Sequence, residues 1–282
     1  MKTGLVLEGG AMRGLFTAGV MDVLMENGVE FSGAIGVSAG AVFGCNYKSR
    51  QIGRVLRYNL RFCRDPRYSG FRSLFLTGDY YGADFCYRRI PEELDPFDLE
   101  AYRANPMAFY AVCTDVESGE PVYPRCELGN GEDLLWFRAS ASMPLVSRTV
   151  KIHGQGYLDG GIADSIPLKK FEEMGYGKNV VVLTQPRNYI KEPSRSFSLM
   201  KIALRKYPAL LRVIEDRPRA YNASTAYVKE REAAGRAFVI SPDAPLPIHR
   251  TENDPEKLKA CYDLGRAAAR RRLEELRRFL EG

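Results

Sequence analysis

The sequence lacks several features on which whole classes of protein depend. It contains only two histidines, His153 and His249. No stretch approaches the roughly 18 consecutive apolar residues that a membrane-spanning helix needs, and the first residues, MKTGLVLEGGAMRG, have no apolar segment of the secretory type. We therefore expect a cytoplasmic protein without a membrane span.

The cysteines show neither of the spacings that would give them a shared chemical role. No CxxC pair occurs, and no histidine pair accompanies them, so the sequence predicts neither a zinc site nor a disulfide framework. We expect small buried side chains at these positions, and no metal and no cofactor. The six are Cys45, Cys63, Cys86, Cys113, Cys126 and Cys261.

Positive charge is present in modest excess and is unevenly distributed. The formal net charge is +6, and arginines crowd into the C-terminal third, for example in GRAAARRRLEELRRFLEG. Such a face is typical of peripheral contact with an anionic membrane or of nucleic-acid binding, but a solvated helix face is the more common explanation. We expect no nucleic-acid partner, and the sequence leaves the oligomeric state open.

The order of apolar patterns indicates an α/β fold. Buried strands are predicted over 3–8, 31–37 and 179–185, helices over 15–28 and 39–62, and a hairpin within 106–124. A further helix is expected over 132–142, a strand pair over 147–161 and a helix over 167–175. Strands that alternate with helices predict three α/β/α layers around a mostly parallel central sheet.

The 282 residues suit one large domain with an elaborated end. We expect a catalytic core over residues 1–185, with an irregular, aromatic-rich insertion at about 51–100. Residues 186–282 are predicted to form a helical, basic extension packed on the same domain. It contains helical sequence over 187–235, a strand within 236–242 and a terminal helix over 254–280.

The stretch AIGVSAG places Ser38 where a strand is expected to turn into a helix. A sharp bend there projects the hydroxyl clear of the sheet, and it tolerates only small neighbours such as Gly36 and Gly40. The following helix N-terminus favours developing negative charge. A nucleophile fits this position, although serine is also a common N-cap residue.

A second glycine-containing loop, EGGAMRG, follows the first strand. Such a loop exposes backbone N–H groups that suit a phosphate or an oxyanion, and it is expected beside Ser38 at the carboxyl ends of adjacent strands. Gly9, Ala11 and Gly14 also approximate a dinucleotide-binding fingerprint, with Glu30 near the offset of a ribose-binding acid. The middle glycine of that fingerprint is missing, so a dinucleotide-binding oxidoreductase is the lesser alternative.

Three segments in this order resemble the patatin-like phospholipase family: GGAMRG, GVSAG and the DGG at Asp159 to Gly161. The resemblance covers roughly residues 3–185 and implies a patatin-like fold and a serine hydrolase of lipid acyl esters. It implies Ser38 as nucleophile and Asp159 as base. The expected oxyanion hole comprises the N–H groups of Gly10 and Ala11, with Gly9. Arg13 and Gly14 would support the loop, in which Ala11 replaces the family's usual third glycine.

Two alternatives remain beside this serine and aspartate pair. Ser38, Asp159 and His249 occur in the chain order of an α/β-hydrolase triad, but only one strand precedes Ser38, and His249 lies in a proline-rich stretch. Asp115 and Asp164 are interpreted as turn or cap residues. The second alternative is a non-catalytic protein of the same fold that binds lipid or an anionic membrane.

Overall fold

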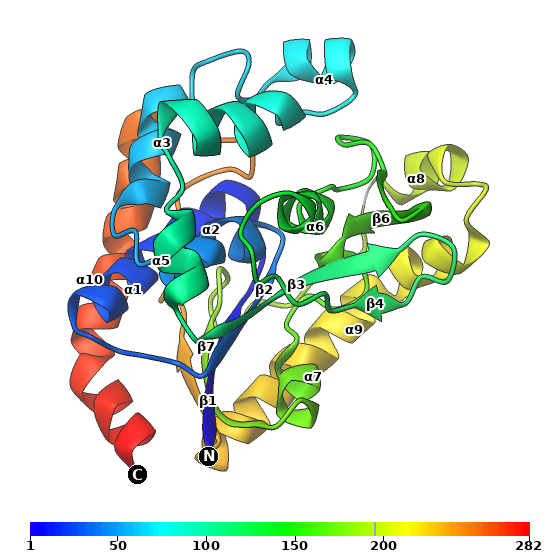
Figure 1. The fold of residues 1–282 in the computed structure, drawn as a ribbon. Helices are drawn as coiled ribbons and strands as arrows, with labels where there is room; N and C mark the ends of the chain where they lie inside the picture. The colour runs from blue at the N-terminus through cyan, green and yellow to red at the C-terminus, as the bar shows by residue number, and fades with distance from the viewer. Residues whose placement is uncertain (195) are drawn as a thin grey trace.

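One mixed sheet runs through the centre of the molecule (Figure 1). The computed structural model describes residues 1–194 and 196–282. Within these residues the strand order is β5-β6-β3-β2-β1-β7-β8, and β4 lies beside β3. The strands are β1 (Lys2–Leu7), β2 (Gly33–Val37), β3 (Ala108–Asp115), β4 (Pro121–Val122), β5 (Val150–Ile152), β6 (Gln155–Asp159), β7 (Tyr176–Val182) and β8 (Ala237–Ile240).

Most of the sheet is parallel, as the alternation of strands and helices predicts. The neighbouring strands β3, β2, β1, β7 and β8 all run in the same direction. Antiparallel pairing is confined to the edge beyond β3, where β4, β6 and β5 lie. The carboxyl ends of the parallel strands therefore meet at one edge, which is where open α/β sheets bind ligands.

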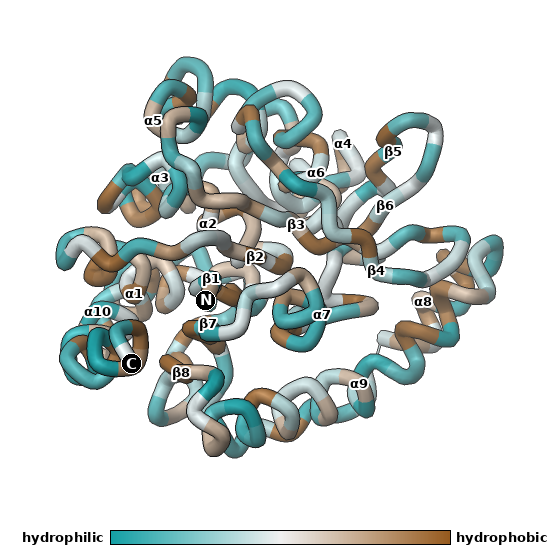
Figure 2. Tube along the Cα trace, turned by 60° about the horizontal axis from the view of Figure 1, so that its bottom comes forward, coloured by the Kyte–Doolittle hydropathy of each residue, from teal (hydrophilic) through white to brown (hydrophobic). Residues whose placement is uncertain are grey.

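Helices cover both faces of the sheet and complete the three layers (Figures 1 and 2). The helices are α1 (Gly14–Glu26), α2 (Ala39–Lys48), α3 (Arg54–Phe62), α4 (Phe71–Thr77), α5 (Leu99–Ala104), α6 (Glu132–Ser140), α7 (Leu168–Glu173), α8 (Phe197–Ala203), α9 (Pro208–Ala233) and α10 (Pro255–Glu281). Short helical segments are η1 (Ala11–Arg13), η2 (Phe85–Leu94) and η3 (Gly160–Ile162).

The alternation of side chains along β1 explains the two apolar cores. Leu5 and Leu7 are fully buried in the core that contains residues of α1, α2 and α10. Val6 belongs to the opposite core, together with Phe171 of α7 and Tyr221 of α9. Successive strand residues point to opposite faces, so one apolar run is buried on both sides.

The C-terminal helix α10 packs closely along α1. Where the two helices cross, a Cβ at Gly19 would overlap the carbonyl of Tyr262, and a Cβ at Gly265 would overlap that of Phe16. An ion pair of 2.7 Å between Arg266 and Glu26 lies beside this crossing. The last part of the chain thus belongs to the same packed body as β1.

Two predicted helical stretches are interrupted. Residues 39–62 form α2 and α3 instead of one helix, because Arg50 and Gly53 adopt positive φ angles of 55° and 74°. Left-handed residues cannot continue a right-handed helix. The helix predicted from residue 187 begins only at Phe197. Pro193 lies before this start, and a proline has no backbone N–H to donate within a helix.

The predicted insertion at 51–100 is largely helical, since it contains α3, α4 and η2. In Figure 1, α3 and α4 lie above the sheet, at the end of the molecule away from the N-terminus. Among the helices in the described residues, none has the length and apolar composition needed to cross a membrane.

Candidate active site

Ser38 occupies a strained turn between β2 and α2. Its backbone angles are φ 54° and ψ −122°, a conformation that non-glycine residues rarely adopt. The carbonyl of Ser38 accepts the N–H of Ala41 at 2.9 Å, and this bond begins the helix. Its side chain makes no N-cap hydrogen bond, so the hydroxyl is not used to cap α2.

The small residues on either side of Ser38 are required by close backbone approaches. A Cβ at Gly36 would overlap the carbonyl of Gly40. A Cβ at Gly40 would in turn overlap the carbonyl of Leu7, at the end of the neighbouring strand β1. The bend thus brings the turn that carries Ser38 directly against the carboxyl end of β1.

The glycine loop after β1 lies beside this turn. A Cβ at Gly9 would come within 2.8 Å of the Cβ of Ser38. Within residues 1–194 and 196–282, no group accepts a hydrogen bond from the backbone N–H of Gly9 or Gly10. Ala11 follows with a φ of 50°, where glycine is the usual residue. The loop therefore offers free donors next to a hydroxyl.

Arg13 and Gly14 hold this loop against its surroundings. Arg13 lies at the end of η1, and its backbone N–H donates to the carbonyl of Gly10 at 3.2 Å. Its Nε lies 3.5 Å from the same carbonyl oxygen. A Cβ at Gly14 would come within 2.9 Å of Ala39, so the start of α1 is packed against the start of α2.

Asp159 ends β6 and turns its carboxyl into a buried position. Oδ1 accepts the backbone N–H of Gly161 at 2.7 Å. Oδ2 is buried and has no hydrogen-bond partner among the described residues. An unpaired buried carboxylate oxygen is costly, and such groups gather at functional sites.

Ser38 and Asp159 line the same small cavity, although they are far apart in the sequence. Burial raises the pKa of the Asp159 carboxyl, and the Ser38 hydroxyl, Arg217 and the N–H of Gly161 oppose this rise. The Ser38 hydroxyl thus lies near enough to favour the charged carboxylate without completing a hydrogen bond to Oδ2. The fold brings together a hydroxyl and a proton acceptor.

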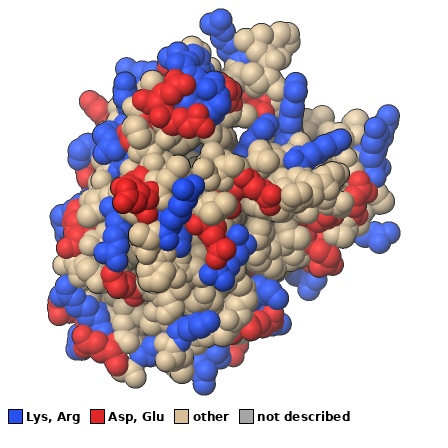
Figure 3. All heavy atoms as spheres, in the orientation of Figure 1, with Lys and Arg blue, Asp and Glu red and all other residues tan. Residues whose placement is uncertain are grey.

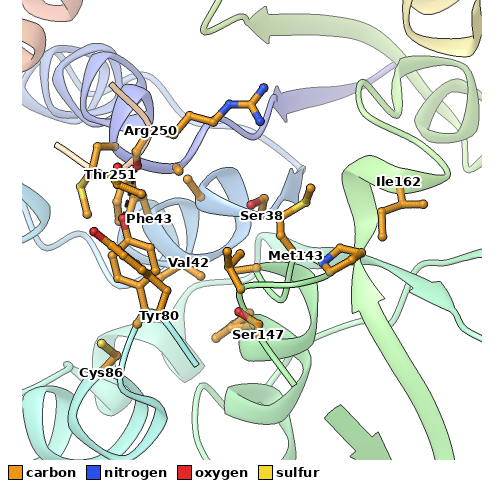
Figure 4. A pocket seen from close by; sticks show the side chains of 18 of the residues that line it. Ser38, Val42, Phe43, Tyr80, Cys86, Met143, Ser147, Ile162, Arg250 and Thr251 are labelled. Atoms are coloured by element: carbon orange, nitrogen blue, oxygen red, sulfur yellow. Dashed lines mark hydrogen bonds between the residues drawn. The ribbon is translucent and has the colours of Figure 1, made fainter. Parts of the chain in front are cut away.

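A second, larger cavity of about 440 Å³ opens from Ser38 towards the insertion. In Figure 4, Ser38 lies between Met143 and Ile162 on one side of this cavity and Tyr80 and Cys86 on the other. Val42 and Phe43 line the wall between, and apolar side chains dominate the lining. A space of this size and composition suits the hydrocarbon part of a ligand.

Other residues that support the site are not marked by any sequence motif. Ser140, at the end of α6, accepts the backbone N–H of Ser38 at 2.9 Å. Glu8 is buried at the end of β1, where it accepts hydrogen bonds from Thr184 at 2.6 Å and from Tyr221 at 2.7 Å. Only tertiary packing brings these partners together.

The two histidines lie outside both cavities. His153 is in the β5–β6 turn, and its Nε2 lies 2.9 Å from a carboxylate oxygen of Glu132. His249 is exposed in the loop before α10. Among the described residues, no group of three histidine, cysteine or acidic side chains is placed to hold a metal ion.

Three other acidic residues considered from the sequence, Glu30, Asp115 and Asp164, do not line the smaller cavity. Glu30 is exposed, pairs with Arg50 and precedes β2, so it lies at the opposite end of that strand from the glycine loop. This placement does not suit a ribose-binding acid. Asp115 accepts the backbone N–H groups of Glu117 and Ser118, both at 2.9 Å, as a turn residue does. Asp164 accepts a hydrogen bond of 2.9 Å from the hydroxyl of Tyr123.

Comparison with known families agrees with this geometry. The family model described as "Patatin-like phospholipase" matches residues 5–171. The chain belongs to the patatin-like phospholipase family. A second model, "Domain of unknown function (DUF6363)", matches residues 207–281. The family supports lipid acyl hydrolysis as the general class of activity, and the fold and family implied by the three motifs are confirmed.

The chain matches only part of the length of each similar protein. The chain is 27% identical over 280 residues to the "Uncharacterized protein YjjU" of Escherichia coli, covering 95% of this chain and 76% of that protein. It is 24% identical over 167 residues to an "Uncharacterized NTE family protein" of Mycobacterium bovis, and this match covers 59% of the present chain and 44% of that protein. Among solved structures, VipD from Legionella pneumophila aligns with a TM-score of 0.49 and 11% identity, covering 97% and 67% of the two chains.

Proposed function

We propose that this protein hydrolyses carboxylic esters of lipids through an acyl-enzyme intermediate. Ser38 is the nucleophile and Asp159 the general base in this proposal. The backbone N–H groups of Gly10 and Ala11, with Gly9, form the oxyanion hole. The observation that carries the proposal is the shared cavity of Ser38 and Asp159, in which Oδ2 of the carboxyl has no partner among the described residues.

The chemistry needs only groups that this chain supplies. Oδ2 of Asp159 accepts the hydroxyl proton while Oγ of Ser38 bonds to the ester carbonyl carbon. The carbonyl oxygen becomes an oxyanion beside the free N–H groups of the glycine loop. The bond to the alcohol then breaks, and the proton on Asp159 passes to the leaving alcohol. Water attacks the acyl group by the same route, releases the acid and restores Ser38.

The larger cavity favours a lipid ester over a small acyl ester. Ser38 lines this cavity, which has a volume of about 440 Å³ and a mainly apolar lining. An acyl chain placed there is removed from water, which stabilises binding by about 0.8 kcal/mol for each CH₂ group. The proposed substrate is therefore a phospholipid, a lysophospholipid or another acyl ester with a hydrocarbon chain.

Covalent labelling by a fluorophosphonate tests the assignment directly, because the reagent reacts only with an activated serine. Intact-mass spectrometry of wild type should show one adduct, and Ser38→Ala should show none. Asp159→Asn should label more slowly, since the base is lost. Ser147→Ala is the matched control, because Ser147 lines the larger cavity without contacting Asp159.

Either of two results would contradict the proposal. One is an unlabelled wild type under conditions that label a known serine hydrolase. The other is an adduct that persists in Ser38→Ala. Retention of label in Ser147→Ala shows that substitution in the cavity does not itself prevent the reaction.

We also propose peripheral contact with anionic membranes through the α4–α8 surface, defined by Phe71, Phe75, Leu76, Leu199 and Ile202. These apolar side chains are exposed, with Phe75 90% accessible. The exposed basic residues Arg72, Lys201, Arg205 and Lys206 lie beside them in the chain. Met200 of α8 lines the larger cavity, so α8 borders the proposed acyl site. Figure 1 places α4 and α8 in the same upper right part of the molecule, where Figure 3 shows Lys and Arg side chains on the surface. Apolar and basic residues together suit a lipid interface.

A further inference from the structure

Thr184 holds the glycine loop after β1 from the end of the neighbouring strand. Thr184 is fully buried and follows β7, which pairs with β1 in the sheet. Its hydroxyl oxygen Oγ1 lies 2.9 Å from the carbonyl oxygen of Gly9 and donates to it. A Cβ at Gly10 would come within 2.7 Å of the same Oγ1. The Thr184 side chain is therefore packed directly on the peptide that joins Gly9 to Gly10.

This hydrogen bond determines the direction of the Gly10 N–H. The carbonyl of Gly9 and the N–H of Gly10 belong to one planar trans peptide, in which the two bonds point in opposite directions. Gly9 and Gly10 line the smaller cavity together with Ser38, and Thr184 lines neither cavity. Because the carbonyl is turned towards Thr184, the N–H of Gly10 is turned away from it, as a donor to the cavity.

The buried carboxyl of Glu8 leaves the Thr184 hydroxyl free to donate to Gly9. Oε2 of Glu8 lies 3.1 Å from Oγ1 of Thr184, and it accepts the backbone N–H of the same residue at 2.6 Å. A threonine hydroxyl has one proton to donate. Oε2 already has a closer donor in the backbone N–H, so the hydroxyl proton goes to the carbonyl of Gly9.

The other oxygen of this carboxyl is held by helix α9. The hydroxyl of Tyr221 donates to Oε1 of Glu8 at 2.7 Å, and the Tyr221 side chain is buried. Burial, followed by the charge of Glu8, raises the pKa of this hydroxyl, so it remains a donor at neutral pH. One chain of hydrogen bonds therefore runs from Tyr221 through Glu8 and Thr184 to the Gly9 carbonyl.

Tyr221 belongs to the part of the chain beyond the patatin-like match. That match ends at residue 171, and the domain of unknown function begins at residue 207. In Figure 2, α9 lies beside β8. The C-terminal region therefore reaches the glycine loop through a buried hydrogen bond as well as through apolar packing.

We propose that Thr184 and Tyr221 are positioning residues of the oxyanion hole, which orient the N–H of Gly10 through the Gly9–Gly10 peptide. The inference rests on the proposed hydrolysis and assigns the C-terminal region a part in it. The N–H of Gly10 stabilises the carbonyl oxygen most when that oxygen carries the negative charge of the transition state. Loss of its orientation should therefore lower kcat and leave KM nearly unchanged.

Hydrolysis of p-nitrophenyl octanoate by three variants tests this inference. Thr184→Val keeps the shape of the side chain and removes the donor, and it should lower kcat by roughly 10- to 100-fold, the usual effect of a small misplacement. Thr184→Ser keeps the hydroxyl and should keep a kcat close to that of wild type. Tyr221→Phe keeps the ring and loses the hydrogen bond to Glu8, so its kcat should fall severalfold. KM should stay near that of wild type in all three.

Matched controls separate positioning from a general loss of stability. Thr17→Val changes an equally buried threonine in α1, whose hydroxyl has no partner among the described residues. Tyr227→Phe removes another hydroxyl of α9, which donates to the carboxyl of Glu172. Neither Thr17 nor Tyr227 lines a cavity, so both variants should keep the wild-type kcat. Thermal unfolding shows that every variant is folded at the assay temperature.

Three outcomes would overturn the inference: a wild-type kcat in Thr184→Val, a wild-type kcat in Tyr221→Phe, or a fall in Thr184→Ser as large as that in Thr184→Val. Failure of the proposed hydrolysis is a separate result, because it appears as absent fluorophosphonate labelling of wild type. Crystal structures of wild type and Thr184→Val then decide whether Thr184 orients the peptide. A turned Gly9 carbonyl in the variant supports this role, and an unchanged one overturns it.

Discussion

The backbone N–H of Ser38 donates a hydrogen bond of 2.9 Å to the hydroxyl of Ser140, which in turn donates one of 2.6 Å to the carbonyl of Val112. This chain of hydrogen bonds joins the turn after β2 to α6 and to β3. The turn has a strained φ of 54° at Ser38, so its geometry depends on such support.

We predict that Ser140→Ala destabilises the protein by about 1 to 3 kcal/mol, because it leaves a buried N–H and a buried carbonyl without a partner. It should also lower kcat by roughly 10- to 100-fold through misplacement of Ser38. Urea unfolding and ester hydrolysis measure the two effects. Ser142→Ala is the control, since its hydroxyl donates only to the carbonyl of Arg138. An unchanged kcat in Ser140→Ala would contradict the prediction.

Ala11 tests the proposed oxyanion hole. Its φ of 50° suits glycine and strains a β-branched side chain. Ala11→Val should displace the loop and lower kcat by roughly 10² to 10³-fold, the usual effect of losing one oxyanion donor. Ala11→Gly should keep a kcat close to that of wild type, because it fits the same backbone. Equal kcat values in the two variants would argue against a role for this N–H.

Local patterns account for the part of the site that could be predicted. The strand that turns into a helix at Ser38 is visible within a few residues, because small neighbours surround a serine after an apolar run. The alternation of strands and helices likewise predicts the parallel sheet. Asp159 had no local signal beyond a common Asp-Gly turn, and its proposed role came from the resemblance.

The cluster of cations that lines the smaller cavity could not be predicted in the same way. Lys191, Arg217 and Arg250 lie on three separate segments with no shared spacing, and the fold alone brings them together. The density of arginine in the C-terminal third was the only signal, and a solvated helix face explained it as well. The break between α2 and α3 could not be predicted either, because arginine rarely adopts the left-handed conformation that Arg50 has here.

The α4–α8 surface predicts how the protein reaches a lipid interface. Burying Phe75 in a bilayer contributes about 1.5 to 3 kcal/mol, so Phe75→Ser should weaken binding to anionic vesicles by roughly tenfold or more. Cosedimentation with such vesicles measures this. Leu264→Ser is the control, because Leu264 is also exposed but lies on α10. Equal binding of wild type and Phe75→Ser would exclude this surface.

The acid limb of the pH profile reports on the proposed base. Only the carboxylate form of Asp159 accepts the Ser38 proton, so kcat/KM should rise as the pH rises through the pKa of Asp159. Burial raises that pKa above its ordinary value of 3.8, and the positive charge of Arg217 opposes the rise. Removing the charge should therefore move the acid limb to higher pH.

We predict that Arg217→Gln shifts the acid limb of kcat/KM upwards, because the carboxylate of Asp159 loses a stabilising cation. A short neutral p-nitrophenyl ester is the substrate, since it carries no charge of its own that could interact with Arg217. Arg217→Lys keeps the positive charge and should leave the limb near that of wild type. If Arg217→Gln lowers kcat/KM equally at every pH, Arg217 acts through its hydrogen bond to the carbonyl of Gly161 and not through the charge of Asp159.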